Sequence, residues 1–369
     1  ARENDSRLYS RFTAQLKEKP ISDFLALEWK DYSSNYAETE TPYVRDHLTG
    51  QFIISVLIAK LGYSDKHAIY LTNSIYKALS LFMLFLIASN FFPRSISAFM
   101  TVLIQLTPVS LNYQMRANHE PALLLLILTA IYGSMKIKEN KSNFLLILGS
   151  VQFCFLIKGI AFLPIIPIIF VTYLISNWPL KKVKISNVLI LSLISSSILL
   201  TALCYEWYFK KLTGFSFFDQ YIKVQLLGRS FSDTKDTLPL LGNIKALGYY
   251  ISRTLSYSLP WSLFALILVV KKRFKLDLNT KQKTFYTTLI CSVFVYILTF
   301  TVSSRTASRY IYPAYFLFSA SSIMFILNHF KSKITITTPK FHLVAALLFL
   351  TLTSISILKA VENASLYIH

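Results

Sequence analysis

The chain has 369 residues, of which 54% are hydrophobic and 15% are aromatic, and its mean hydropathy is +0.49. This composition excludes a soluble enzyme and is typical of a polytopic membrane protein. The net charge of +20 would suit a nucleic-acid-binding protein, but the lysines lie in short segments between apolar runs. The charge is therefore a signal of membrane topology.

Apolar runs close to the length that crosses a hydrocarbon core, roughly 17 to 25 residues, recur along the chain. They centre on 68–92, 95–112, 119–135, 142–157, 159–177, 185–205, 255–270, 284–303, 310–328 and 341–358. The runs are too long and too uniformly apolar for barrel strands, and a backbone in lipid must satisfy its own hydrogen bonds. The sequence therefore predicts an all-α polytopic membrane protein with about ten transmembrane helices.

Basic residues gather in every second segment between these runs. The four basic clusters are Lys136, Lys138 and Lys141; Lys181, Lys182 and Lys184; Lys271, Lys272, Arg273, Lys275, Lys281 and Lys283; and Lys331, Lys333 and Lys340. The positive-inside rule assigns them to the cytoplasm. The segments then expected on the outer side are 1–67, 113–118, the turn at Lys158, 206–254, 304–309 and 359–369. We expect an integral protein of the bacterial inner membrane, with its active site facing the periplasm or the outside.

We expect one transmembrane domain over 1–369, with two large outer loops. The first loop, 1–67, contains an apolar stretch, Gln51–Leu61, that is too short to span and predicts an interfacial helix. The second loop, 206–254, is rich in aromatic residues, which suit a membrane interface. The chain begins at Ala1 without a methionine, and we expect one further span upstream.

Motifs of several other chemistries are missing from the sequence. There is no GxxxxGK[ST], HExxH, GxSxG or GxGxxG pattern, so ATPase, metalloprotease, serine hydrolase and dinucleotide-binding functions have no support. The three cysteines lie inside apolar runs without CxxC spacing. Neither a disulfide framework nor a metal site is expected.

Lys158 stands almost alone in an apolar hairpin, between the run Asn143–Ile157 and the run Ile160–Ile175. A charge at the centre of a bilayer costs roughly 2.5 to 3.5 kcal/mol on insertion scales. Such a lysine lies at an interface, pairs with a partner or lines a polar cavity. The topology places it at the outer face, where a snorkelling anchor and a ligand-binding residue are the two interpretations.

Other unusual polar residues fall on the same predicted face. They are Asp5, Tyr9, His47, Arg116, His119, Glu120, Arg309 and Tyr310. Carboxylates beside cations suit a reaction in which a base deprotonates a nucleophile while cations hold an anionic leaving group, such as a lipid-linked phosphate. Each residue also has a structural interpretation: a solvated acid, a loop histidine, an interface anchor or an acid in the first turn of a helix.

Six short motifs follow one another along the chain. They are Asp5-Ser6-Arg7-Leu8-Tyr9, Pro42-Tyr43-Val44-Arg45-Asp46-His47, His119-Glu120-Pro121-Ala122-Leu123, Leu156-Ile157-Lys158-Gly159, Pro260-Trp261 and Ser308-Arg309-Tyr310-Ile311-Tyr312-Pro313. Their order resembles that of the GT-C membrane glycosyltransferases, in the branch of the lipid A aminoarabinose transferases and protein O-mannosyltransferases. The chain departs from that pattern at Ser6, where the family has a second acid, and at Pro42, where it has Pro-Pro.

The resemblance implies a hexosyl- or pentosyltransferase that moves a sugar from a polyprenyl-phosphate donor to an acceptor hydroxyl or phosphate on a lipid, glycan or protein. By this resemblance Asp5 is the base, with Glu120 assisting or orienting, in a single displacement that inverts the anomeric carbon. Lys158, Arg309 and Arg116 hold the donor phosphate, and Tyr9, His47, His119 and Tyr310 shape the pocket. The resemblance assigns no cofactor, and a requirement for a divalent cation is left open.

Three alternatives remain open. A transporter or flippase for lipid-linked saccharides would place polar residues at mid-depth in the spans and would usually show a repeat; the spans are expected to be bare there. An O-antigen polymerase or ligase would carry its key residues in one large outer loop, such as 206–254. A degenerate relative that only binds lipid would fit the loss of the second acid at Ser6.

Overall fold

The computed structural model describes residues 2–29, 42–45, 47–113, 120–179, 182–223, 239–271, 278–302 and 307–330, with 347, 350, 351, 354, 355 and 358. Only the backbone is described for residues 2–5, 111–113, 161 and 239–241. The described part consists of α and 3-10 helices with one isolated bridge, between Glu28 and Tyr43. The all-α prediction is confirmed for this part of the chain.

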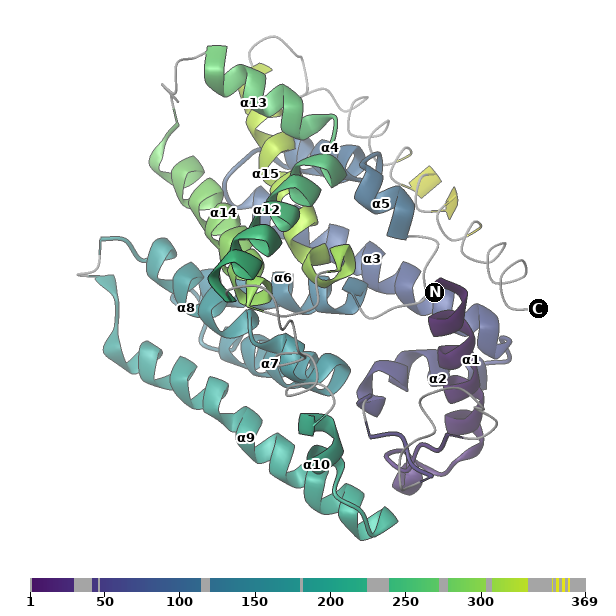
Figure 1. Ribbon diagram of the computed structural model, residues 1–369. Helices are drawn as coiled ribbons and strands as arrows, with labels where there is room; N and C mark the ends of the chain where they lie inside the picture. Colours follow the sequence, from purple (N-terminus) through teal and green to yellow (C-terminus); the bar gives the residue numbers. More distant parts are fainter. Residues whose placement is uncertain are drawn as a thin grey trace.

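The helices are arranged as shown in Figure 1. In chain order they are α1 (Arg2–Glu18), η1 (Ile21–Asp23), η2 (Thr49–Phe52), α2 (Ile53–Lys60), α3 (Asp65–Ser89), α4 (Arg94–Gln105), α5 (Pro108–Tyr113), α6 (Glu120–Lys136), α7 (Asn143–Lys158), η3 (Gly159–Phe162), α8 (Ile165–Ser176), α9 (Ile185–Thr213), α10 (Phe217–Tyr221), α12 (Pro239–Tyr257), α13 (Trp261–Lys271), α14 (Thr280–Thr301), η6 (Ser308–Ile311) and α15 (Tyr312–Phe330).

Local sequence signals set several of these helix ends. The side chain of Ser64 accepts a hydrogen bond from the backbone of His67 and starts α3. A reciprocal capping box between Asn279 and Gln282 starts α14. Gly214 ends α9 in the left-handed conformation, with φ of 79°, because glycine carries no Cβ to clash there.

Four helical segments in the described part are long and apolar enough to cross a membrane: α3, α9, α14 and η6 with α15. The Gly242–Tyr257 part of α12 and α13 form a fifth candidate, bent by 98°. The shorter apolar helices include α7 and α8. The count of about ten spans stays a prediction, and most of the run 341–358 lies outside the described residues.

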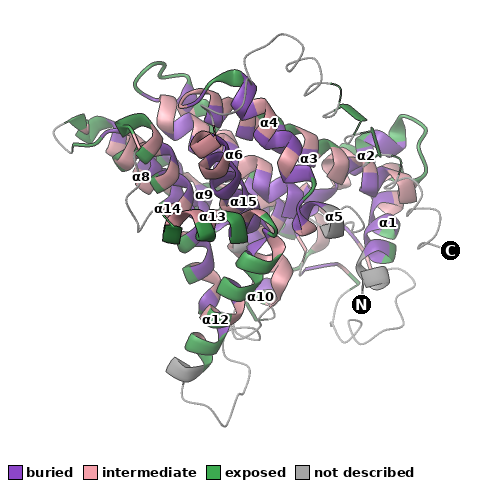
Figure 2. Ribbon diagram, turned by 90° about the horizontal axis from the view of Figure 1, so that it is seen from above, coloured by how far each residue is buried: buried purple, intermediate pink, exposed green. Residues whose placement is uncertain are grey.

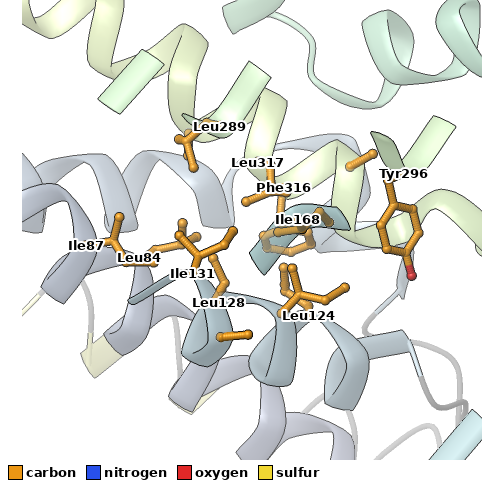
Figure 3. Packing of buried hydrophobic residues seen from close by; sticks show 14 of the residues in the cluster. Leu84, Ile87, Leu124, Leu128, Ile131, Ile168, Leu289, Tyr296, Phe316 and Leu317 are labelled. Atoms are coloured by element: carbon orange, nitrogen blue, oxygen red, sulfur yellow. The ribbon is translucent and has the colours of Figure 1, made fainter. Parts of the chain in front are cut away.

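The core of the bundle surrounds α6. Helices α3, α7, α8 and α15 all pack against it, and Figure 3 shows Leu124, Leu128 and Ile131 at helical spacing among side chains from α3, α8, α14 and α15. Gly133 lets α7 approach closely, since a Cβ there would lie 2.9 Å from the side chain of Ile147. Small residues at such crossings favour helix association in lipid, where water expulsion contributes little.

The periphery of the bundle is apolar as well. Buried residues fill the middle and exposed ones lie at its rim (Figure 2). On α9, which runs along the edge of the bundle in Figure 1, the exposed residues include Leu189, Leu193, Leu199 and Leu203. So large an exposed apolar surface fits a helix that faces lipid.

Two predicted boundaries differ from the structure. The apolar run 95–112 forms two helices, because Pro108 starts α5 after α4 has ended at Gln105. The apolar run 185–205 forms a longer helix, because α9 continues to Thr213, and α10 and α12 also lie in the segment 206–254. Hydropathy detects apolar segments, so it does not show that a helix continues into polar sequence beyond the apolar run.

Two of the predicted basic clusters lie close together. Burial lowers the pKa of Lys138, and the positive charges of Lys182 and Lys184 lower it further. The turn between α6 and α7 is therefore near the turn between α8 and α9. This proximity agrees with the alternation from which the topology was predicted.

The expectation that the spans are bare at mid-depth is wrong for α3. Lys77 lies at the centre of this helix with 7% of its surface exposed, and its ammonium nitrogen has no hydrogen-bond partner among the residues that the structure describes. A buried charge without a partner is strongly unfavourable. Lys77 is therefore a destabilising feature of the fold.

Replacing Lys77 by methionine should stabilise the protein, because the stem of the side chain keeps its packing while the unpaired nitrogen is removed. We expect a gain of about 1 to 4 kcal/mol, measured as a higher unfolding midpoint in detergent. Lys60→Met, the same change at an exposed position of α2, is the control and should shift stability by less than about 0.5 kcal/mol. Equal shifts in both variants would contradict the assignment.

Candidate active site

The candidate site is built on an ion pair between the ends of two helices. The Nζ atom of Lys158, the last residue of α7, lies 2.6 Å from Oε1 of Glu120, the first residue of α6. Because α6 and α7 form an antiparallel hairpin through their connecting turn, these two ends meet at the same end of the bundle. Each charge also interacts favourably with its helix dipole, because the carboxylate lies at an N-terminus and the ammonium at a C-terminus.

The ion pair is buried but not saturated. The side chain of Glu120 is 2% exposed and that of Lys158 is 16% exposed. An ammonium has three N–H donors, and among the described residues the side chain of Lys158 donates to Glu120 alone. Within the same part of the chain, the second carboxylate oxygen of Glu120 is buried and has no hydrogen-bond partner. Lys158 therefore has donors to spare for a bound anion.

A second cation and an aromatic ring complete this side of the site. Nζ of Lys158 lies 5.9 Å from the ring centroid of Tyr310, and Cζ of Arg309 lies 5.9 Å from the same centroid. The ring stacks on Phe300 of α14, with centroids 5.8 Å apart. The predicted residues Glu120, Lys158, Arg309 and Tyr310 are thus brought together from three parts of the chain.

The first outer segment packs against the same end of α7. The ring of Tyr9 on α1 meets His47 at 6.0 Å and Phe52 at 5.6 Å, both edge to face. Helix η2, which ends at Phe52, packs on α7. Gly50 makes that contact possible, because a Cβ there would lie 2.6 Å from the carbonyl oxygen of Leu156. Tyr9 and His47 are therefore held near the Lys158 turn.

Asp5 was expected in an irregular loop, but its backbone lies in the first part of α1, one turn before Tyr9. Its side chain is not among those described. Arg116 and His119 lie outside the described residues. Their predicted roles, as a phosphate ligand and a pocket residue, stay predictions.

Two residues near the site were not singled out by the sequence. The hydroxyl of Tyr221 on α10 accepts a hydrogen bond from the backbone N–H of Ile160, at 3.0 Å. Nη1 of Arg45 donates to the carbonyl of Ser216 at 3.0 Å. The sequence signal for Tyr221 was the density of aromatic residues in 215–221. The signal for Arg45 was its place in the motif that begins with Pro42-Tyr43.

Metal binding has no side-chain cluster to support it in the part of the chain that the structure describes. No group of three or more His, Cys, Asp or Glu side chains there could hold a metal ion. The neighbours of the described carboxylate, Glu120, are a lysine and aromatic rings. The described residues are thus suited to binding an anion.

The chain is similar in sequence and in fold to known proteins. Residues 48–204 match the family of dolichyl-phosphate-mannose-protein mannosyltransferases. The match covers less than half of the chain and includes Glu120 and Lys158 but not α1 or η6. Protein mannosyltransferases belong to the branch of proteins that the motifs resemble.

Two solved structures of ArnT from Cupriavidus metallidurans are similar to this chain in fold. The structure bound to undecaprenyl phosphate matches 88% of this chain with a TM-score of 0.60 and 11% identity. The apo structure matches 87% with a TM-score of 0.55 and 12% identity. The chain spans 55% and 54% of the length of these two structures. No curated protein matches the chain. The prediction of an all-α polytopic membrane fold is confirmed.

The ion pair yields a prediction about stability. Lys158→Met leaves the carboxylate of Glu120 buried and unpaired, so we expect a loss of about 3 to 5 kcal/mol. Adding Glu120→Gln should recover part of that loss, because the unpaired charge is removed. The measurement is a double-mutant cycle of unfolding free energies in detergent.

The control for this cycle is the more exposed pair of Lys136 and Glu139, whose Nζ and Oε2 atoms are 2.7 Å apart. The same cycle there should give a coupling below about 1 kcal/mol. A coupling at Glu120 and Lys158 no larger than that of the control would contradict the buried-pair assignment.

Proposed function

We propose that the protein is a glycosyltransferase that moves a sugar from a polyprenyl-phosphate donor to an acceptor at the membrane surface. The observation that carries this proposal is a lysine with unused donors, held by a buried carboxylate beside a second cation. An ammonium so placed suits the phosphate of a lipid whose tail lies among the helices. The similarity in fold to ArnT bound to undecaprenyl phosphate supports the same class of donor.

The donor phosphate would be held by Lys158 and Arg309, with Arg116 as a third cation. As the bond between the anomeric carbon and the phosphate oxygen breaks, negative charge grows on the leaving phosphate. Cations that are already in place stabilise that charge without reorganisation. The Tyr310 ring lies 5.9 Å from Nζ of Lys158 and from Cζ of Arg309, so it would hold both cations near the phosphate by cation–π attraction.

The base would be Asp5 and not Glu120. Glu120 is already bonded to Lys158, so its role is to orient the ammonium. Asp5 would take the proton of the acceptor hydroxyl while that oxygen attacks the anomeric carbon from the side opposite the phosphate. A single displacement of this kind inverts the anomeric carbon. Tyr9, His47 and His119 would shape the acceptor side of the pocket.

The site would face the periplasm or the outside of a bacterial inner membrane. The basic clusters at the turns between α6 and α7 and between α8 and α9 mark the opposite, cytoplasmic end. A polyprenyl-phosphate sugar is already activated, so transfer at the outer face of the membrane would need no nucleotide. The acceptor would be a hydroxyl or phosphate of a lipid, a glycan or a protein.

The donor site is tested by binding of undecaprenyl phosphate to the protein in nanodiscs. Lys158→Gln keeps a donor for Glu120 but removes the positive charge, so we expect binding weakened about 10- to 100-fold. Lys210→Met, at an exposed position of α9, should bind as the unaltered protein does. Unchanged binding by Lys158→Gln would overturn the proposed donor site.

The base is tested separately by Asp5→Asn. We expect undecaprenyl phosphate binding to be retained and transfer to fall about 100- to 10,000-fold, because the acceptor hydroxyl loses its proton acceptor. Transfer is measured as sugar released from a panel of polyprenyl-phosphate hexoses and pentoses in membranes that contain acceptor. Full transfer by this variant would remove Asp5 from the mechanism.

Two alternatives are weighed by the same geometry. Lys77 is a polar residue at mid-depth, as a transporter would need, but in the described part of the chain its ammonium nitrogen has no hydrogen-bond partner that would continue a polar path. For a polymerase or ligase the key residues would lie in 206–254. The two cations beside the Tyr310 ring, Lys158 and Arg309, instead lie at the end of α7 and in η6, which favours the transferase.

A further inference from the structure

The turn that follows Lys158 is held by a residue far away in the sequence. Tyr221 on α10 is 6% exposed. Its hydroxyl accepts the N–H of Ile160 at 3.0 Å and lies 3.5 Å from the carbonyl oxygen of Lys158, to which it can donate. It thus bridges the backbone on both sides of Gly159. The carbonyl of Lys158 is among the last of α7, which have no partner within their own helix.

Gly159 is shaped to receive that hydroxyl. Its φ is 55°, a conformation that glycine adopts without a steric penalty. A Cβ on Gly159 would lie 2.0 Å from the Tyr221 hydroxyl oxygen. The turn and the tyrosine therefore fit together only because this residue has no side chain.

Helix α10 is itself anchored on two other sides. The Oε2 atom of Glu206 accepts the N–H groups of Phe217 and Phe218, both at 3.0 Å. Arg45 donates to the carbonyl of Ser216 at 3.0 Å. These bonds tie α10 to the end of α9 and to the first outer segment. The position of Tyr221 is consequently fixed by both outer segments.

We infer that Tyr221 is a positioning residue: by closing the end of α7 it sets where the Lys158 ammonium stands, and it couples the second outer segment to the donor-phosphate site. The inference rests on the proposed function, because it takes Lys158 as the phosphate ligand. The hydroxyl of Tyr221 contacts the backbone at Lys158 and Ile160, so its effect on the phosphate passes through the position of Lys158. Displacement of α10 would change phosphate binding without any contact between α10 and the lipid.

The variant Tyr221→Phe tests this inference, since it keeps the ring stacked on Phe217 and removes only the hydroxyl. We expect undecaprenyl phosphate to bind about three- to tenfold more weakly. The matched control is Tyr208→Phe, whose hydroxyl bonds to the carbonyl of Ser22 at 2.9 Å, away from the Lys158 turn. Its binding should be unchanged, with a similar unfolding midpoint in the two variants.

A second measurement separates positioning from a general loss of structure. In a Lys158→Gln background, Tyr221→Phe should produce no further weakening, because both changes act through one ammonium. If Tyr221→Phe weakens binding equally in both backgrounds, or not at all in the unaltered protein, the inference is overturned. If Lys158→Gln alone leaves binding unchanged, it is the proposed donor site that fails.

Discussion

The ion pair between Glu120 and Lys158 is the interaction on which the site depends. Burying either charge alone would be strongly unfavourable, and the 2.6 Å contact between them requires the ends of α6 and α7 to meet. The close packing of these helices at Gly133 provides that alignment. The apolar core around α6 therefore positions a charge whose remaining donors point to an anionic ligand.

Three segments that are remote in sequence converge on the end of α7. Helix η2 reaches it through Gly50, α10 through Tyr221, and η6 through Tyr310. The long apolar helices thus form the frame, and η2, α10 and η6 pack around the candidate site at the end of α7. The sequence match to a family, residues 48–204, contains the ion pair, whereas the similarity in fold extends over most of the chain.

Hydropathy and charge predicted much of the fold but missed features of a different physical kind. The apolar runs located α3, α6, α7, α8, α14 and α15, because lipid-facing helices need continuous apolar surface. The polar extension of α9 to Thr213 and the helical backbone at Asp5 were interpreted as loops, since hydropathy carries no information about helicity outside lipid. Lys77, inside an otherwise apolar run, was overlooked because one charge hardly changes the average of the run.

The sequence by itself determined the class of protein, its all-α architecture and the motifs that contain the candidate cations. Only the tertiary structure decided which groups meet: Glu120 and Lys158 are 38 residues apart, and Ile160 and Tyr221 are 61 apart. Motif order places residues on one face of a membrane, but it does not fix the rotation and depth of each helix. The rotation and depth of each helix depend on side-chain packing between helices. This packing brings Lys158, which is isolated in the sequence, into a buried ion pair with Glu120.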